Sequence, residues 1–124
     1  MVLRCVIVDD NARFLEAARA LLEREGVDVV GVAGTIAEAL RLVDEVRPDV
    51  TLVDIDLGAE SGFDLASRLA CNGGRAPYRA ILISTHAEAD FADLIDSSPA
   101  VGFLSKSDLS AEALYAILNE SPER

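Results

Sequence analysis

The sequence has few cysteines and no long apolar run. Cys5 and Cys71 lack metal-ligand spacing and are too few for a disulfide framework, so both are expected to be reduced thiols. No apolar stretch approaches the roughly 18 to 20 residues that cross a bilayer. The only run that resembles the apolar part of a signal peptide, residues 5–8, is too short and is followed by two aspartates. These absences predict a cytoplasmic protein.

Basic residues are also scarce. Lys and Arg number 11 against 22 Asp and Glu, for a formal net charge of −11. Such a chain is repelled by phosphate backbones and anionic lipid, so we expect no direct contact with nucleic acid or a membrane. The glycine-rich motif G-x-G-x-x-G is missing after the first apolar run, which argues against a dinucleotide or flavin site.

The apolar content suits one domain. The chain has 124 residues, of which 51% are hydrophobic, enough for a single core. Repeats, low-complexity tracts and linkers are missing from the sequence. We expect one domain over residues 1–120 and a short polar tail over residues 121–124.

Short β-branched runs alternate with longer amphipathic segments along the chain. The expected strands cover residues 3–8, 27–33, 50–53, 80–83 and 101–104, and the expected helices cover 12–25, 36–46, 63–70, 87–95 and 111–118. Continuous apolar strands joined by crossover helices are typical of a parallel sheet covered on both faces. The pattern therefore predicts a doubly wound α/β fold.

Helix ends carry matching local signals. Gly26 is a C-terminal stop for the first helix, and Pro48 ends the second. Thr35 and Glu38 form a capping-box pattern, and Ser110 can cap the last helix.

Polar residues follow four of the five expected strands. They are Asp9 and Asp10 after the first strand, Asp54 and Asp56 at the third, Ser84 and Thr85 after the fourth, and Lys106 after the fifth. Ligands of doubly wound sheets bind at this edge. Clustered carboxylates repel one another, so their presence in one crevice predicts a hard cation, and Mg2+ is the usual one for phosphoryl chemistry. Lys106, the only lysine, would complement an anion.

Several of these residues also have a purely structural interpretation. Asp10 can cap the first helix, where acidic side chains are favourable, and this role is compatible with metal binding. Ser84 can be a strand-end hydroxyl bonded to backbone, and Lys106 a solvated surface lysine.

Four motifs decide between these interpretations when they are taken together. They are an apolar strand with Asp9-Asp10, residues 52–57 with Gly62, residues 81–84, and residues 102–106. The intervals are 44 residues from Asp10 to Asp54, 30 from Asp54 to Ser84, and 22 from Ser84 to Lys106. In order and spacing the chain resembles the receiver domains of bacterial two-component response regulators, from residue 3 to about 119. That resemblance implies a flavodoxin-like sheet of strand order 2-1-3-4-5 with five helices.

The resemblance also implies a metal site around a phosphoacceptor. Asp54 would accept a phosphoryl group, Asp10 would bind Mg2+ directly, and Asp9 would bind it at longer range or through water. Asp56 would contribute its backbone carbonyl. Mn2+ could replace Mg2+ at such a site.

Three further residues gain roles from the resemblance. Lys106 would pair with the acceptor carboxylate and then with the phosphoryl oxygens, while the Ser84 hydroxyl would bond one of those oxygens. Phe103 would be the switch aromatic, whose ring moves inward after phosphorylation. This movement would alter the surface formed by the fourth helix, fifth strand and fifth helix.

Three positions depart from, or modify, the family pattern. Gly58 stands where a proline is usual, which predicts a more mobile loop after the third strand. Thr85 stands where a smaller residue is common, and its bulk is expected to narrow access to the acceptor. His86 lies at the rim, where it either influences hydrolysis or is simply solvated.

The implied partners are a histidine kinase or phosphotransfer protein upstream and an output protein or domain downstream. A homodimer stays open, as does the choice between a stand-alone regulator and a receiver belonging to a longer protein. The domain is expected to be a phosphoacceptor that assists its own phosphorylation and dephosphorylation, not an enzyme acting on other substrates.

Two alternatives compete with this interpretation. One is a receiver-like interaction module that works without phosphate. The other is an aspartyl phosphatase of the haloacid-dehalogenase type, whose first motif resembles Asp54-Ile55-Asp56. That motif normally lies near the N-terminus, whereas here it belongs to the third strand.

Overall fold

The strands form one parallel sheet. The computed structural model of the chain describes residues 2–71, 79–85 and 92–118. The strands of this sheet are β1 (Arg4–Val8), β2 (Asp28–Ala33), β3 (Val50–Asp54), β6 (Ala80–Ser84) and β7 (Gly102–Ser105). They pair in the order β2-β1-β3-β6-β7, and every pairing is parallel. The predicted five-stranded sheet and its strand order are confirmed.

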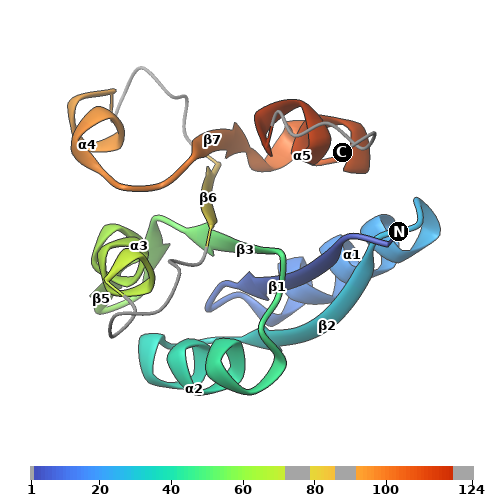
Figure 1. The fold of residues 1–124 in the computed structure, drawn as a ribbon, viewed down its shortest axis with the longest axis horizontal. Helices are drawn as coiled ribbons and strands as arrows, with labels where there is room; N and C mark the ends of the chain where they lie inside the picture. The colour runs from blue at the N-terminus through green and yellow to red at the C-terminus, as the bar shows by residue number, and fades with distance from the viewer. Residues whose placement is uncertain (1, 72–78, 86–91, 119–124) are drawn as a thin grey trace.

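Helices cover both faces of the sheet. They are α1 (Ala12–Arg24), α2 (Ile36–Val46), α3 (Gly62–Ala70), α4 (Ala92–Ser97) and α5 (Ala111–Leu118). Figure 1 shows α1 and α5 on one side of the sheet, with α2 and α3 on the other. In the part of the chain that the structure describes, no helix is long and apolar enough to cross a membrane.

Strand side chains alternate between the two layers of the core. In β1, Cys5 and Ile7 join the core under α1 and α5, whereas Val6 and Val8 join the core under α2 and α3. All four side chains are fully buried. Because both faces are covered, the strand is apolar throughout, which explains why the sequence shows a continuous run and no alternation.

Most predicted caps are present, with one exception. The Thr35 hydroxyl accepts a hydrogen bond from the amide of Glu38 at 3.1 Å, and Ser110 accepts one from the amide of Ala113 at 3.0 Å. The interpretation of Asp10 as the cap of the first helix is wrong. Asn11 caps α1, and its side chain accepts from the amides of Arg13 and Phe14.

Some local elements differ from the sequence prediction. A hairpin of β4 (Asp56–Leu57) and β5 (Glu60–Ser61) follows β3, and a 3-10 helix covers Lys106–Asp108. Neither was predicted. α4 ends two residues beyond the predicted limit, at Ser97, while residues 87–91 of the predicted helix lie outside the described residues. The predicted polar tail also lies outside them.

One carboxylate joins the end of α1 to the start of α5. The amide of Ala111 donates to Glu25 Oε1 at 2.6 Å, so a negative group meets a first-turn N–H of α5. Glu25→Ala should lower the free energy of unfolding by about 1 kcal/mol in chemical denaturation. Glu25→Gln keeps an acceptor oxygen and should therefore retain most of the stability that Glu25→Ala loses. The control is Glu16→Ala, which removes an exposed carboxylate in the middle of α1; equal losses in Glu25→Ala and Glu16→Ala would contradict a capping role.

Candidate functional site

Polar residues converge at the carboxyl ends of the strands, as the sequence predicted. Asp9 follows β1, Asp54 ends β3, Ser84 ends β6, and Lys106 follows β7. Asp9, Asp54 and Ser84 are 0%, 5% and 2% exposed. Among the described residues only one other polar side chain, Thr51, is buried. Buried polar groups are therefore concentrated at this edge, and because burying a polar group is costly, this edge is the candidate functional site.

Three carboxylates form the centre of the site. Carboxylate oxygens of Asp9, Asp10 and Asp54 lie within 4.8 Å of one another. The hard oxygen donors of such a set fit Mg2+ or a similar cation. Among the described residues Lys106 is the one ammonium in contact with them, which leaves two formal negative charges in the cluster. The residues present thus fit a divalent cation in both donor type and charge.

Lys106 bridges two of these carboxylates. Its Nζ lies 2.6 Å from Asp9 Oδ2 and 3.1 Å from Asp54 Oδ2. The other oxygens are held by backbone amides, since Asp54 Oδ1 accepts from Asp56 N at 3.1 Å and Asp9 Oδ1 from Asn11 N at 2.9 Å. Both buried carboxylates are consequently fixed in orientation.

The environment changes the acidity of Asp54 and Lys106. Burial raises the pKa of Asp54 to about 6, with a further rise from the charge of Asp9, against the lowering effects of the Asp56 amide and Lys106. Burial lowers the pKa of Lys106, but the hydrogen-bonding oxygens and charges of Asp9 and Asp54 outweigh it and the net pKa is raised. Lys106 therefore stays charged at neutral pH, next to a carboxylate that is costly to ionise.

Two glycines allow the backbone to approach the cluster closely. A Cβ at Gly62 would lie 2.0 Å from the carbonyl oxygen of Asp54, so any side chain there would displace the start of α3. Gly58, in the turn between β4 and β5, has φ 71° and lies beside Asp10 Oδ2. Proline fixes φ near −65°, so the usual family residue cannot adopt this turn. The loop is folded as a hairpin, and its expected mobility stays a prediction.

The remaining predicted residues lie at the edge of the site or outside the described residues. The Asp56 side chain is exposed and its amide faces Asp54. Phe103 is half-buried on β7 against the core of α2 and α3. Thr85 is exposed directly after β6, and His86 lies outside the described residues. The access and modulating roles of Thr85 and His86 stay predictions.

Sequence reasoning missed one aromatic residue. The ring centroid of Phe14 lies 4.3 Å from Lys106 Nζ. A helix that begins just after Asp10 carries position 14 back toward the same strand end, one turn further on. This spacing could have identified Phe14, but the strand-end pattern that predicted the site contains only polar residues.

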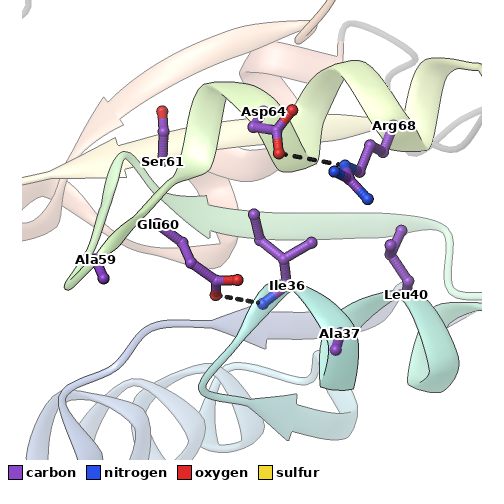
Figure 2. Close-up of a pocket in the computed structure, with 8 residues that line it drawn as sticks. All are labelled: Ile36, Ala37, Leu40, Ala59, Glu60, Ser61, Asp64 and Arg68. Atoms are coloured by element: carbon purple, nitrogen blue, oxygen red, sulfur yellow. Dashed lines mark hydrogen bonds and ion pairs between the residues drawn. The ribbon is translucent and has the colours of Figure 1, made fainter.

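A separate pocket of about 480 Å³ lies between α2, the β4–β5 hairpin and α3 (Figure 2). Its lining residues are Ile36, Ala37, Leu40, Ala59, Glu60, Ser61, Asp64 and Arg68. Figure 2 shows that its charged groups are used within the protein: Ile36 N donates to Glu60 Oε1 at 2.9 Å, and Arg68 Nε to Asp64 Oδ2 at 3.2 Å. The acidic cluster, and not this pocket, is the candidate site.

Comparison with known families agrees with this geometry. A family model described as the response regulator receiver domain matches residues 5–119. The chain belongs to the response regulator receiver domain family. The residues that reach the strand ends are thus part of a receiver domain of the kind found in two-component systems.

Relatives of this receiver domain include proteins described as transcriptional regulators. NarL of Mycobacterium tuberculosis, described as a transcriptional regulatory protein, is 35% identical over 117 residues, which cover 94% of this chain and 53% of NarL. A Pseudomonas aeruginosa transcriptional regulator is 31% identical over 113 residues, which cover 91% of this chain and 54% of the relative. The chain therefore spans about half the length of these curated relatives.

Solved receiver structures share its fold. The signal receiver domain of NarL from Mycobacterium tuberculosis has a TM-score of 0.81 at 31% identity, covering 99% of this chain and 98% of that one. A LuxR-family response regulator from Aurantimonas sp. SI85-9A1 also has a TM-score of 0.81, at 30% identity. The match covers 99% of this chain and 92% of that one.

Proposed function

We propose that this receiver domain accepts one phosphoryl group on Asp54 in the presence of Mg2+. The observation that carries the proposal is the position of Asp54, a buried carboxylate that faces Lys106 and shares a cluster with Asp9 and Asp10. The carboxylates of Asp9, Asp10 and Asp54, with the backbone carbonyl of Asp56, would hold the cation. Bound Mg2+ would offset negative charge on the phosphoryl oxygens.

The protein's own groups orient the transfer. A carboxylate oxygen of Asp54 attacks phosphorus in line, so that an O–P bond forms and the bond from phosphorus to the donor breaks, with its electron pair leaving on the donor. Lys106, already 3.1 Å from Asp54 Oδ2, neutralises charge on the transferring group. The Ser84 hydroxyl bonds a phosphoryl oxygen. Water later hydrolyses the acyl phosphate and regenerates Asp54.

Phosphorylation is proposed to alter the surface formed by α4, β7 and α5. Ser84 pairs in register with Ser105, two residues beyond Phe103, so a movement of Ser84 toward the phosphoryl group would be felt first at β7. The ring of Phe103 is half-buried. Phosphorylation would increase the population of the conformer in which this ring lies further inward. This surface would then control an output protein or domain.

The proposed setting is a cytoplasmic signalling pathway. A histidine kinase or phosphotransfer protein would supply the phosphoryl group. NarL and the Pseudomonas protein are described as transcriptional regulators, and this chain spans about half of their length, so DNA contact would belong to an output region. The receiver domain itself carries a net charge of −11, which disfavours DNA. The domain is proposed to cover residues 1–120.

Intact-mass spectrometry with acetyl phosphate tests the proposal. With Mg2+ the protein should gain one phosphoryl group, with EDTA none, and fragment masses should place the group on the peptide containing Asp54. A label on another residue would contradict the acceptor assignment, and no label at all would favour the phosphate-independent interaction module. Repeated turnover of a generic phosphomonoester would favour the phosphatase alternative.

A further inference from the structure

We propose that Phe14 is a positioning residue for Lys106, holding its ammonium between Asp9 and Asp54 for phosphoryl transfer. The inference rests on the proposed function of Asp54 and Lys106, and it assigns a role to a residue that bears no polar group. The effect of Phe14 would pass entirely through Lys106.

Three groups surround the ammonium of Lys106. An ammonium has three N–H donors and no acceptor. Two sides face carboxylates, with Asp9 Oδ2 at 2.6 Å and Asp54 Oδ2 at 3.1 Å. The third partner is the Phe14 ring, whose centroid lies 4.3 Å from Nζ, within the range of about 6 Å at which an aromatic face attracts a cation. The Lys106 side chain is only 13% exposed, so the ring occupies space that water would otherwise take.

The position of Phe14 is fixed by its helix, whereas the side chain of Lys106 is intrinsically flexible. Asn11 caps α1 and accepts from the amide of Phe14, which fixes this residue in the first turn of the helix. The ring also packs against the core shared by α1 and α5. Lys106 reaches the cluster from beyond β7 on a flexible four-carbon stem. A fixed ring therefore restricts the rotamers of a mobile cation.

This restriction matters because the two carboxylates compete for one ammonium. Asp9 Oδ2 is the nearer, at 2.6 Å against 3.1 Å for Asp54 Oδ2. Without the ring, Lys106 can turn toward solvent or toward Asp9 alone, and in both cases it leaves the acceptor. Transfer requires positive charge already in place where charge develops, so the loss of orientation slows the reaction although the ammonium remains.

The first experiment compares phosphorylation rates with acetyl phosphate and Mg2+. Phe14→Leu should react about tenfold more slowly, which corresponds to ~1.4 kcal/mol, within the range of a largely desolvated cation–aromatic contact. Phe14→Tyr keeps the ring and should react at nearly the wild-type rate. The matched control is Leu15→Ala, because Leu15 is the next residue of α1, is also half-buried and packs against the same core. Its rate should stay within about twofold of wild type.

A double-mutant cycle separates positioning from general packing. Lys106→Met should slow phosphorylation strongly, and adding Phe14→Leu should slow it no further. A tenfold additional loss in the Lys106→Met background would overturn the inference, because the ring would then act without the ammonium. An unchanged rate in Phe14→Leu alone would also overturn it, while leaving Asp54 as acceptor.

A second measurement needs no phosphorylation. Lys106 is the only lysine, so lysine-specific 13C labelling gives a single ε-methylene signal in the NMR spectrum. The ring should shift the ε-methylene protons of Lys106 upfield in the wild type and in Phe14→Tyr. In Phe14→Leu these protons should have the chemical shift of a lysine that has no aromatic neighbour. If the wild-type signal is already ordinary, the positioning role is wrong. If the shift is present but the protein takes no phosphoryl group, the proposed function fails and the contact stands.

Discussion

Asp54→Asn should abolish phosphoryl labelling and, at neutral pH, stabilise the metal-free protein. Loss of labelling follows from removal of the carboxylate oxygen that is proposed to attack phosphorus. The gain in stability follows from burial, which raises the pKa of Asp54 from 3.8 to about 6, with an added contribution from repulsion by Asp9. The ionised side chain is therefore costly in the folded state, and asparagine has a similar shape without the charge.

The sign of the pH dependence follows from linkage. A carboxyl group whose folded-state pKa is raised binds its proton more tightly in the folded than in the unfolded chain. The stability that this proton contributes is fully present below 3.8 and is lost as pH rises through about 6. The asparagine side chain of the variant does not titrate and has no such dependence. The free energy of unfolding of the variant should exceed that of the wild type by about 2 to 3 kcal/mol near pH 7.5. This difference should shrink toward zero near pH 4.

Urea unfolding in EDTA at the two pH values measures this difference. Asp28→Asn is the control, because it makes the same change of charge at an exposed position of β2. Adding Mg2+ should then stabilise the wild type, since a ligand that binds only the folded state raises its stability, but should have little effect on Asp54→Asn. A stability difference that is equal at both pH values would show that it does not arise from ionisation of Asp54.

The parts of the fold that depend on periodicity were predictable from sequence. Five apolar strands and their crossover helices follow from which side chains must be buried on both faces of the sheet, and α2 and α5 match their predicted limits. The β4–β5 hairpin was not predictable in this way. Its strands have two residues each, and it depends on the positive φ of Gly58 and on the bond from Ile36 N to Glu60.

The candidate site, like the fold, was only partly predictable from sequence. The rule that ligands bind at strand ends identified Asp9, Asp10, Asp54 and Lys106. It could not decide which of two adjacent polar residues caps α1, because Asp10 and Asn11 are both good caps. The structure places the Asp10 carboxylate in the acidic cluster, and Asn11 caps the helix. Nor does a pattern of polar residues reveal that an aromatic ring lies beside Lys106.

Asp10→Asn should bind Mg2+ at least about tenfold more weakly than the wild type while retaining the fold. Its carboxylate is one of three within 4.8 Å. Unit charges about 4 Å apart interact by about 4 kcal/mol in surroundings typical of a protein surface, and a divalent ion doubles that attraction before water screens part of it. Without metal, the same carboxylate is repelled by Asp9 and Asp54, so the melting temperature of the variant should hold or rise.

Titration calorimetry of Mg2+ into Asp10→Asn and into Asp56→Asn distinguishes a ligand from a nearby charge. Asp56 is exposed, precedes the hairpin turn beside Asp10, and is proposed to contribute only its backbone carbonyl. Both substitutions remove one negative charge. If Asp10 is a direct ligand, its substitution should weaken binding by at least about tenfold and that of Asp56 by much less, because an exposed charge outside the coordination sphere is screened. Equal losses would mean that Asp10 acts only through its charge, and an unchanged affinity in Asp10→Asn would remove it from the metal site altogether.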